Sequence, residues 1–402
     1  MEAAPVWRRS STAEILSIGT ELTVGDTRDT NGGELARSLT SVGVRVLRMT
    51  AIPDDLPVVT EAFRAALTRS DLVVSTGGLG PTPDDLTREA IAAVAGETPA
   101  VDPGLERWLR RLWSRRGMPF PAINLKQAWL IPSATALANP NGTAPGWFVR
   151  RPDGRTIVAL PGPPREMRPM WHEHALPLLQ SGGLGVDVAS ITYRLAGIGE
   201  SQVADLLGEP LLRGTNPVVA TYARAEAVDV RISATGTETA SATALVEPAA
   251  ATVRERIGGW IWATGETTWS GAIGDRLQVL GWDLGLVEIG TGGQVGALFG
   301  DVPWLRVATS IAAPGPAPTD DDVVGRARRV RDDAGSDVGL AVHVWESEDD
   351  AIAIVGVATP SGDHVERRTV FLSGSNGRTR AALAAASILL VAIGPREGTP
   401  KP

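Results

Sequence analysis

Glycines and paired carboxylates follow one short apolar run of the sequence, residues 71–75. Glycine permits close approach of backbone N–H groups to phosphate oxygens, and a predicted helix over residues 86–95 adds the positive end of a helix dipole. Asp84 and Asp85, just before that helix, could cap it, coordinate Mg²⁺ or orient water at a phosphorus centre. Together these features favour a phosphate site over a capped turn. The candidate ligand-binding residues here are Thr76, Gly77, Gly78 and Gly80.

Three further polar loops that contain glycine or proline lie near the ends of predicted strands. Because ligands of doubly wound sheets bind at the carboxyl ends of the strands, one phosphate-rich ligand could contact several of these loops. Alone, the loop with Pro161 and Gly162 is equally typical of a surface turn. The candidate residues are Gly19, Thr20, Glu21 and Asn31 in the first loop, Asn141, Gly142 and Thr143 in the second, and Pro161 and Gly162 in the third.

The basic residues are almost all arginine, because only Lys126 and Lys401 are lysine among 38. Arginine keeps its proton, so Lys126 is the one internal residue suited to lysine chemistry. Lysines are most often solvated surface residues, but the retention of Lys126 in a chain that otherwise uses arginine favours a phosphate contact. The absence of cysteine excludes thiol nucleophiles, disulfides, iron–sulfur clusters and cysteine-based zinc sites.

The charge and hydropathy of the chain limit its partners. A net charge of −8 argues against a general nucleic-acid binder and against a protein that binds anionic membranes. No apolar signal segment follows the first residues, and residues 381–393 are too few and too rich in alanine to span a bilayer. We therefore expect a cytoplasmic protein without membrane partners.

Three segments must position the candidate residues: 13–182, 187–264 and 267–395. In the first, strands alternate with helices, which indicates an α/β fold whose parallel sheet carries helices on both faces. The predicted strands are residues 13–18, 44–49, 71–75 and 156–160. The predicted helices are residues 31–42, 56–68, 86–95 and 105–116.

The other two segments differ in pattern from the first. The second segment is a small α+β module without a reactive cluster, and a role as spacer or dimerisation domain is more plausible for it than catalysis. The third segment is again α/β, and its residues 312–322 form a Pro/Asp loop with no packing pattern. The predicted strands are 189–195, 227–233, 282–287, 338–344 and 352–358, and the predicted helices are 199–207, 238–257, 273–280 and 378–391.

Taken together, the motifs resemble the competence/damage-inducible protein A (CinA) family. In the first segment they are Gly19-Thr-Glu-Leu22, Asp29-Thr-Asn31, Thr76-Gly-Gly-Leu-Gly-Pro-Thr82, Asp84-Asp85-Leu-Thr87, Asn124 with Lys126-Gln-Ala128, Asn141-Gly-Thr-Ala-Pro-Gly146 and Leu160-Pro-Gly-Pro-Pro164. In the second they are Gly197-Ile-Gly-Glu-Ser-Gln202 and residues 216–222. The resemblance implies a molybdopterin-binding-like doubly wound domain with the active cleft, a KH-like connector, and a CinA C-terminal domain.

The resemblance also implies a chemistry for the first domain. Related domains bind molybdopterin or adenylylate it, and in CinA proteins the domain is associated with metal-dependent hydrolysis of ADP-ribose. The family's acidic residues fall on Asp85 and Asp54, and Asp84 with Asp85 would hold Mg²⁺, Mn²⁺ or Co²⁺. The family likeness further suggests a homodimer, and nucleic acid is not an expected partner despite the KH-like connector.

The third segment departs from the family's pattern. There the family deamidates nicotinamide mononucleotide with the serine of a Glu-Ser-Cys-Thr-Gly-Gly motif. The corresponding residues here are Glu288, Ile289, Gly290, Thr291, Gly292 and Gly293. Isoleucine has no nucleophilic atom, the family's downstream tyrosine and lysine are absent between residues 291 and 335, and the second family loop is replaced by His343-Val-Trp-Glu-Ser347. We therefore expect a degenerate amidase domain without deamidase activity.

Three functions remain open for the first domain. The first is hydrolysis of an ADP-ribose-type pyrophosphate, in which a divalent metal activates water while the glycine loops and Lys126 bind phosphate. The second is binding of a nucleotide or molybdopterin without turnover. The third is transfer of an adenylyl group to molybdopterin, which the residues do not distinguish from hydrolysis.

Overall fold

The computed structural model describes residues 9–223, 227–312, 317–347, 350–370 and 374–394. The chain divides into two compact units. The first unit comprises the chain up to Val188 together with Thr235–Ser241, and the second comprises Ala189–Ala234 and the chain from Ala242 onward. The predicted second and third segments therefore contribute to the same unit.

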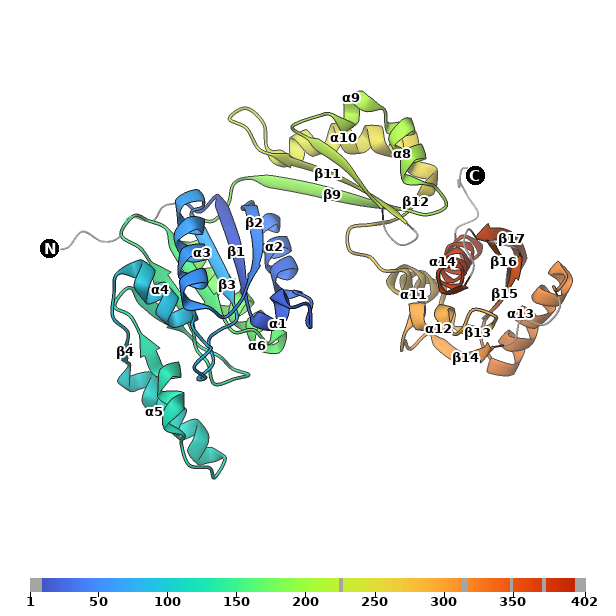
Figure 1. Ribbon diagram of the computed structural model, residues 1–402. Helices are drawn as coiled ribbons and strands as arrows, with labels where there is room; N and C mark the ends of the chain where they lie inside the picture. The colour runs from blue at the N-terminus through green and yellow to red at the C-terminus, as the bar shows by residue number, and fades with distance from the viewer. Residues whose placement is uncertain (1–8, 224–226, 313–316, 348–349, 371–373, 395–402) are drawn as a thin grey trace. The chain divides into compact units, whose positions relative to one another are not determined.

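A six-stranded sheet forms the centre of the first unit (Figure 1). Its order is β2 (Arg45–Ile52), β1 (Thr12–Ile18), β3 (Leu72–Thr76), β8 (Thr156–Leu160), β7 (Gly146–Arg150) and β6 (Ala134–Leu137). The first four strands are parallel, whereas β7 is antiparallel to β8 and β6 to β7. The sheet is thus mixed and not parallel throughout, because a tight turn at Gly154 joins β7 to β8 and can only produce a hairpin.

Helices cover both faces of this sheet, as the alternation of strands and helices predicts (Figure 1). Leu16 packs in the core cluster on one face, and its neighbour Ile15 packs in the cluster on the other face. Successive side chains of a strand point to opposite faces, so an unbroken apolar run fits a strand buried on both sides. The helices of this unit are α1 (Thr20–Thr23), α2 (Asn31–Ser41), α3 (Leu56–Arg69), α4 (Thr87–Ala95), α6 (Pro164–Pro169) and α7 (Leu176–Ser181), with a π-helical turn, η2 (Met170–Ala175), between the last two.

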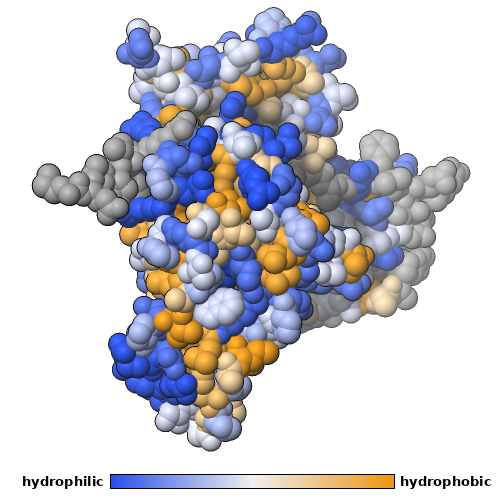
Figure 2. Space-filling view, turned by 60° about the vertical axis from the view of Figure 1, so that its left-hand side comes forward, coloured by the Kyte–Doolittle hydropathy of each residue, from blue (hydrophilic) through white to orange (hydrophobic). Residues whose placement is uncertain are grey.

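A smaller substructure of the first unit carries the predicted arginine-rich helix, α5 (Pro103–Arg115). Asp102 caps this helix by accepting a hydrogen bond from the N–H of Leu105. The apolar side of α5 packs on the 3₁₀ segment η1 (Ala122–Ala128). A two-stranded sheet adjoins η1 and consists of β4 (Ala100–Val101) and β5 (Trp129–Leu130). Figure 2 shows hydrophilic and hydrophobic surface side by side on the projection that contains α5. This packing positions η1 and its Lys126.

The second unit begins with a four-stranded sheet in the order β10-β11-β9-β12. Helices pack on this sheet, and their buried side chains share one hydrophobic core with those of the strands. Its elements are β9 (Val188–Leu195), α8 (Glu200–Leu207), α9 (Glu209–Leu212), β10 (Val218–Ala223), β11 (Val228–Thr235), α10 (Ala242–Ile257), η3 (Gly258–Trp260) and β12 (Ile261–Thr264). Helix α10 begins at Ala242 and not at residue 238, because Thr237 and Ala240 close a turn through two hydrogen bonds. The predicted α+β character is confirmed.

A five-stranded sheet completes the second unit. Its order is β14 (Leu305–Ile311), β13 (Leu284–Ile289), β15 (Val338–Ser347), β16 (Asp350–Thr359) and β17 (Gly362–Val370), and the last two strands run antiparallel to their neighbours. Its helices are α11 (Trp269–Leu280), α12 (Gln294–Phe299), α13 (Asp320–Ala334) and α14 (Gly374–Ala392). The α/β fold class predicted for the third segment is confirmed. Among the described helices, none is long and apolar enough to cross a membrane.

The predicted loop over residues 312–322 is wrong at its carboxyl end. Residues 313–316 lie outside the described residues, but Asp320–Asp322 form the first turn of α13. Thr319 and Asp322 form a reciprocal capping box, with 2.7 Å between Thr319 Oγ1 and an Asp322 carboxylate oxygen. Acidic residues at a helix start are stabilised by the helix dipole. This acidic run therefore indicates the start of a helix, although the composition around it is typical of a loop.

Candidate functional site

Asn31 joins three of the predicted loops at the carboxyl end of the first sheet. Its amide nitrogen Nδ2 donates to Thr76 Oγ1 at 2.8 Å and to the carbonyl of Gly162 at 2.7 Å. The Thr76 hydroxyl in turn lies 3.3 Å from the carbonyl of Pro161. The side-chain oxygen of Asn31 is buried and has no hydrogen-bond partner among the described residues. The start of α2 and the ends of β3 and β8 therefore meet at one side chain.

Gly77 and Gly78 are required by the close packing of this junction. Gly77 has a φ of +101°, its N–H donates to Leu160, and a Cβ there would lie 1.9 Å from the carbonyl oxygen of Ile18. Gly78 has a φ of +64°, and a Cβ there would lie 2.3 Å from the hydroxyl of Thr87. A side chain at Gly77 would displace backbone, and one at Gly78 would displace the Thr87 side chain, so both positions require glycine. The two glycines thus have a structural role whether or not they bind phosphate.

The carboxylate of Asp85 closes the glycine-rich loop on itself. It accepts hydrogen bonds from the N–H of Gly80 and the N–H of Thr82, each at 2.8 Å, and from the hydroxyl of Thr82. The N-cap residue of α4 is Leu86, and no side chain caps that helix. The helix-capping alternative for Asp84 and Asp85 is therefore wrong, because Asp85 holds the loop that precedes the helix.

Asp84 is exposed beside this loop. The hydroxyl of Thr82, its own backbone N–H and the charge of Lys126 lower the pKa of Asp84, although partial desolvation opposes them. Hydrogen bonds and a nearby positive charge favour the ionised form of a carboxyl group. Asp84 thus presents a negative charge to solvent at the mouth of the loop.

Lys126 is largely buried and bound to neighbouring elements, and it is not a solvated surface lysine. Its side chain is 12% exposed, and its Nζ lies 2.6 Å from a carboxylate oxygen of Glu89 and 3.3 Å from the carbonyl of Thr82. The ammonium also lies 5.9 Å from the ring centroid of Trp129. These contacts connect η1 to both α4 and the glycine-rich loop, which fixes the position of that loop.

Asp54 lies at the adjoining strand ends, where β1 and β2 finish. It accepts hydrogen bonds from the N–H of Thr20 at 2.7 Å and from its hydroxyl at 3.1 Å, and the N–H of Gly19 donates to Ile52. Glu21, beside Thr20, is exposed. Among the described residues, no group of three or more His, Asp or Glu side chains is arranged to hold a metal ion. These acids thus do not form an all-protein metal cage.

The loop before β7 is held between α6 and η1. Asn141 donates to the carbonyl of Arg165 at 2.8 Å, and the hydroxyl of Thr143 accepts a hydrogen bond from the side chain of Gln127 at 3.1 Å. A Cβ on Gly142 would lie 2.1 Å from a carboxylate oxygen of the buried Glu166. All three candidate residues of this loop are therefore positioned by neighbouring elements.

Arg88 also belongs to this site, although the sequence patterns did not indicate it. It is fully buried, and its guanidinium donates to the carbonyls of Leu79 at 2.7 Å and of Pro145 at 3.0 Å. Burial lowers the pKa of Arg88 to about 10, although the negative charges of Glu89 and Asp85 oppose this shift. Arg88 thus links the glycine-rich loop to the loop before β7. An available signal was its position on the same face of the predicted helix as apolar residues 91 and 92.

The motif at residues 288–293 forms a tight turn in the second unit. Glu288 is 2% exposed, and its carboxylate accepts hydrogen bonds from the Thr291 hydroxyl and from the N–H of Val295 at 2.9 Å and Gly296 at 3.1 Å. Ile289 ends β13 and is 3% exposed. Gly292 and Gly293 both have positive φ. The Glu288 carboxylate therefore holds the first turn of α12 in place.

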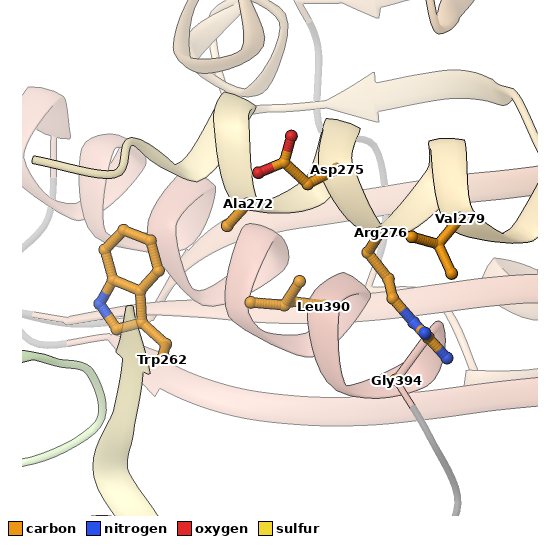
Figure 3. A pocket seen from close by; sticks show the side chains of 7 residues that line it. All are labelled: Trp262, Ala272, Asp275, Arg276, Val279, Leu390 and Gly394. Carbon is orange, nitrogen blue, oxygen red and sulfur yellow. The ribbon is translucent and has the colours of Figure 1, made fainter. Parts of the chain in front are cut away.

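The second unit also carries an open pocket of about 420 Å³ on α11 and α14 (Figure 3). Its polar groups include Asp275 and Arg276, and Arg276 donates to the carbonyl of Ile393 at 2.7 Å. The lining residues are Trp262, Ala272, Asp275, Arg276, Val279, Leu390 and Gly394. None of the residues predicted for a site lines it.

Two family models match the chain. Residues 14–181 match the model described as "Probable molybdopterin binding domain", and residues 190–263 match the model described as "Damage-inducible protein CinA KH domain". Both matches agree with the resemblance inferred from the motifs of the first two segments.

Curated relatives extend the likeness to nearly the whole chain. A CinA-like protein of Deinococcus radiodurans is 51% identical over 294 residues, which is 72% of each chain. A CinA-like protein of Thermomicrobium roseum is 38% identical over 393 residues, 95% of this chain and 96% of the relative. A solved structure, described as CinA with unknown function from Thermoplasma acidophilum, is 35% identical with a TM-score of 0.39, over 42% of this chain and 98% of that one. The predicted family is confirmed, and the chain belongs to the CinA family, with a molybdopterin-binding-like domain at its start.

Proposed function

We propose that the first unit binds a phosphate-rich ligand at the carboxyl ends of β1, β3 and β8 and hydrolyses ADP-ribose or a related nucleotide pyrophosphate. The observation that supports this most is the junction at Asn31, where the loops after β3 and β8 and the start of α2 meet. Ligands of doubly wound sheets bind at such strand ends. The net reaction adds water across the pyrophosphate and gives AMP and ribose 5-phosphate.

The side-chain oxygen of Asn31 supports a ligand that donates hydrogen bonds. The carbonyl of Gly162 can only accept, so the NH₂ group of Asn31 must face it and the oxygen must point elsewhere. A buried acceptor without a partner costs about 1–3 kcal/mol, which a ligand donor would recover. The ribose hydroxyls of ADP-ribose and the N–H groups of molybdopterin supply such donors.

The acidic residues fit a metal ion that is shared with the substrate. Asp84 is exposed and its pKa is lowered, whereas Asp85 is largely occupied by the amides of its own loop. Mg²⁺ is commonly held by one or two carboxylates together with phosphate oxygens and water. Asp84, with the free lone pairs of Asp85, would hold Mg²⁺, Mn²⁺ or Co²⁺, which would neutralise pyrophosphate charge and activate water.

The other residues of the site maintain its shape. Asp85 keeps the loop between Gly80 and Thr82 closed, and Lys126 holds Thr82 to α4 and η1. Asp54 holds Thr20 at the end of β1. Positioning of this kind contributes to catalysis by keeping ligand groups in a reactive arrangement before the reaction begins.

The test is release of AMP from ADP-ribose by the full-length protein with Mg²⁺, Mn²⁺ or Co²⁺. We expect turnover by the wild type, its loss in Asp85→Ala, and a reduction of about 100-fold or more in Asp84→Asn, which keeps the loop intact. Asp153→Asn, in a turn between two strands, is the matched control and should retain activity. A wild type that is inert with all three metals would rule out hydrolysis.

A second candidate is binding of a nucleotide or molybdopterin without turnover. It is favoured by the engagement of Asp85 with its own loop and by the lack of a three-carboxylate group in the described chain. Calorimetry with ADP-ribose, AMP and a molybdopterin analogue separates the two, because binding without AMP release supports this candidate. Adenylyl transfer would require ATP and molybdopterin together, and would form pyrophosphate.

For the second unit we propose that nicotinamide mononucleotide deamidation is lost. Ile289 offers no nucleophile, and the carboxylate of Glu288 is taken up by the turn that it stabilises. The remaining functional suggestion for this unit is assembly, in line with a homodimer.

A further inference from the structure

Strand β14 forms an uncovered edge of the five-stranded sheet in the second unit. In the described part of the chain it pairs with β13 alone, through a parallel register that runs from Leu305 to Ile311. Every residue from Arg306 to Ile311 is exposed, including Val307 at 41% and Ile311 at 42%. An edge strand presents unpaired N–H and C=O groups, which are a template for another strand.

The two edges of this sheet differ in charge. The opposite edge strand, β17, carries charged or titratable side chains along its length, namely Asp363, His364, Glu366, Arg367 and Arg368. Proteins commonly place charges on edge strands to prevent pairing with a second molecule. Strand β14 carries none from Val307 to Ile311, and Arg306 at its start is bound by Asp283 of the same sheet. One edge is therefore protected and the other is not.

The sequence of β14 is also complementary to itself. If two copies of the strand pair in antiparallel fashion about Thr309, Val307 of one copy faces Ile311 of the other. In the same register Ala308 faces Ser310, and Arg306 faces the uncharged Ala312. Apolar and β-branched side chains opposite one another stabilise a strand pair, and no like charges meet.

We propose that β14 is a homodimer interface, at which two copies of the chain join their five-stranded sheets into one continuous sheet. The occupant is a second copy, because the exposed apolar pair matches itself and the edge lacks any charge that would attract an oppositely charged segment. This proposal does not depend on the ligand or the reaction of the first unit.

The absence of cysteine from the chain allows a direct test by cross-linking. In Thr309→Cys, the two thiols would face each other across the dimer axis, where side chains of opposite residues lie within about 5.5 Å at Cβ. Val279→Cys is the control, since Val279 is 76% exposed on α11 of the same unit. We expect Thr309→Cys to form a disulfide-linked dimer at least about tenfold faster than the control. Equal rates would overturn the proposal.

A charge substitution provides the second measurement, by sedimentation equilibrium of the full-length protein. The wild type should be a dimer at micromolar concentration, and Thr309→Lys should raise its dissociation constant about tenfold or more because two like charges meet at the axis. Val279→Lys should not change it. A monomeric wild type, which would leave the edge to a strand of another protein, overturns the proposal, as does a dimer that Thr309→Lys leaves intact.

Discussion

The amide nitrogen of Asn31 lies 2.7 Å from the carbonyl oxygen of Gly162, although 131 positions separate the two residues in the chain. The same nitrogen lies 2.8 Å from Thr76 Oγ1. Both acceptors stand at or just beyond the ends of parallel strands, so this one side chain keeps the two strand ends at a constant separation. Any ligand held at these strand ends depends on that separation.

Asn31→Asp should weaken both the fold and ligand binding. The change replaces the NH₂ group by a carboxylate oxygen, which would face the carbonyl oxygen of Gly162 with no hydrogen between the two oxygens. This should lower the free energy of unfolding by about 2 kcal/mol. Urea unfolding followed by tryptophan fluorescence measures the first effect, and calorimetry with ADP-ribose should show affinity lower by about tenfold or more. Unchanged stability and affinity would contradict the role assigned to this side chain.

Gly77→Ala should destabilise the first unit by about 2 kcal/mol or more, because its Cβ would collide with the backbone of Ile18 at a positive φ. Gly117→Ala is the matched control, since Gly117 also has a positive φ but has open space around the added carbon. The control should lose only about 1 kcal/mol. Chemical denaturation of both variants checks the difference, and equal losses would refute the close approach.

Lys126 and Glu89 should prove energetically coupled. A double-mutant cycle of Lys126→Met and Glu89→Gln should give a coupling energy of about 1 kcal/mol or more, because both side chains are largely buried and lie 2.6 Å apart. If Lys126 also contacts phosphate, Lys126→Met should lose ADP-ribose binding while Glu89→Gln retains most of it. Equal binding by both variants would show that Lys126 stabilises the fold and does not contact phosphate.

The pH dependence of the first unit should report on Asp71. Burial alone would raise the pKa of this carboxyl, but hydrogen bonds from Thr12 and Ser11 outweigh it and lower the pKa below its ordinary value of 3.8. Because the folded value is the lower one, the stabilisation is present above about pH 3.8 and is lost as the pH falls through the folded value. Asp71→Asn should therefore be less stable at neutral pH and lose less stability on acidification.

Urea unfolding of wild type and Asp71→Asn between about pH 7 and pH 3 measures this difference. Asp26→Asn, which changes an exposed carboxyl after α1, should follow the wild type. If Asp71→Asn lost stability in parallel with the wild type on acidification, the hydrogen bonds at Asp71 would not be the cause.

If deamidation of nicotinamide mononucleotide is lost, as we propose, Ile289→Ser should not restore it. The new hydroxyl would lie at the end of β13 beside Glu288, whose carboxylate already accepts three hydrogen bonds, and the described chain offers no lysine there. An ammonia-release assay on wild type and variant checks this expectation. Ammonia release by the wild-type protein would show that the reaction uses another nucleophile.

Local patterns predicted the strands and helices of the site well. Strand β8 spans the predicted residues 156–160, because a short apolar run between turn residues has one reasonable interpretation. Helix α3 begins at the predicted Leu56, since Asp55 caps it by accepting from the N–H of Val58. The positions of the candidate loops after predicted strands also indicated one edge of the sheet, and Asn31 joins three of these loops there.

The partners of the candidate residues could not be predicted. Asp85 binds Gly80 and Thr82 within its own loop, which depends on a loop conformation that spacing does not specify. The burial of Arg88 depends on two carbonyls distant in sequence, and a charged residue within a helix is ordinarily exposed. Periodicity reveals which face a helix buries, but it does not reveal which distant backbone atoms that face meets.

The closed loop at Asp85 has a consequence for ligand exchange. Its amides already hold a carboxylate of the protein itself. If a ligand phosphate bound these amides, it would therefore have to substitute for Asp85 and would not enter a vacant site. The displaced Asp85 carboxylate would stay close to the loop because it is part of the chain. It would repel the ligand phosphate unless a cation balanced the two negative charges. Metal-complexed nucleotides should therefore compete for this loop far better than free phosphate does, which would protect the site from inhibition by inorganic phosphate.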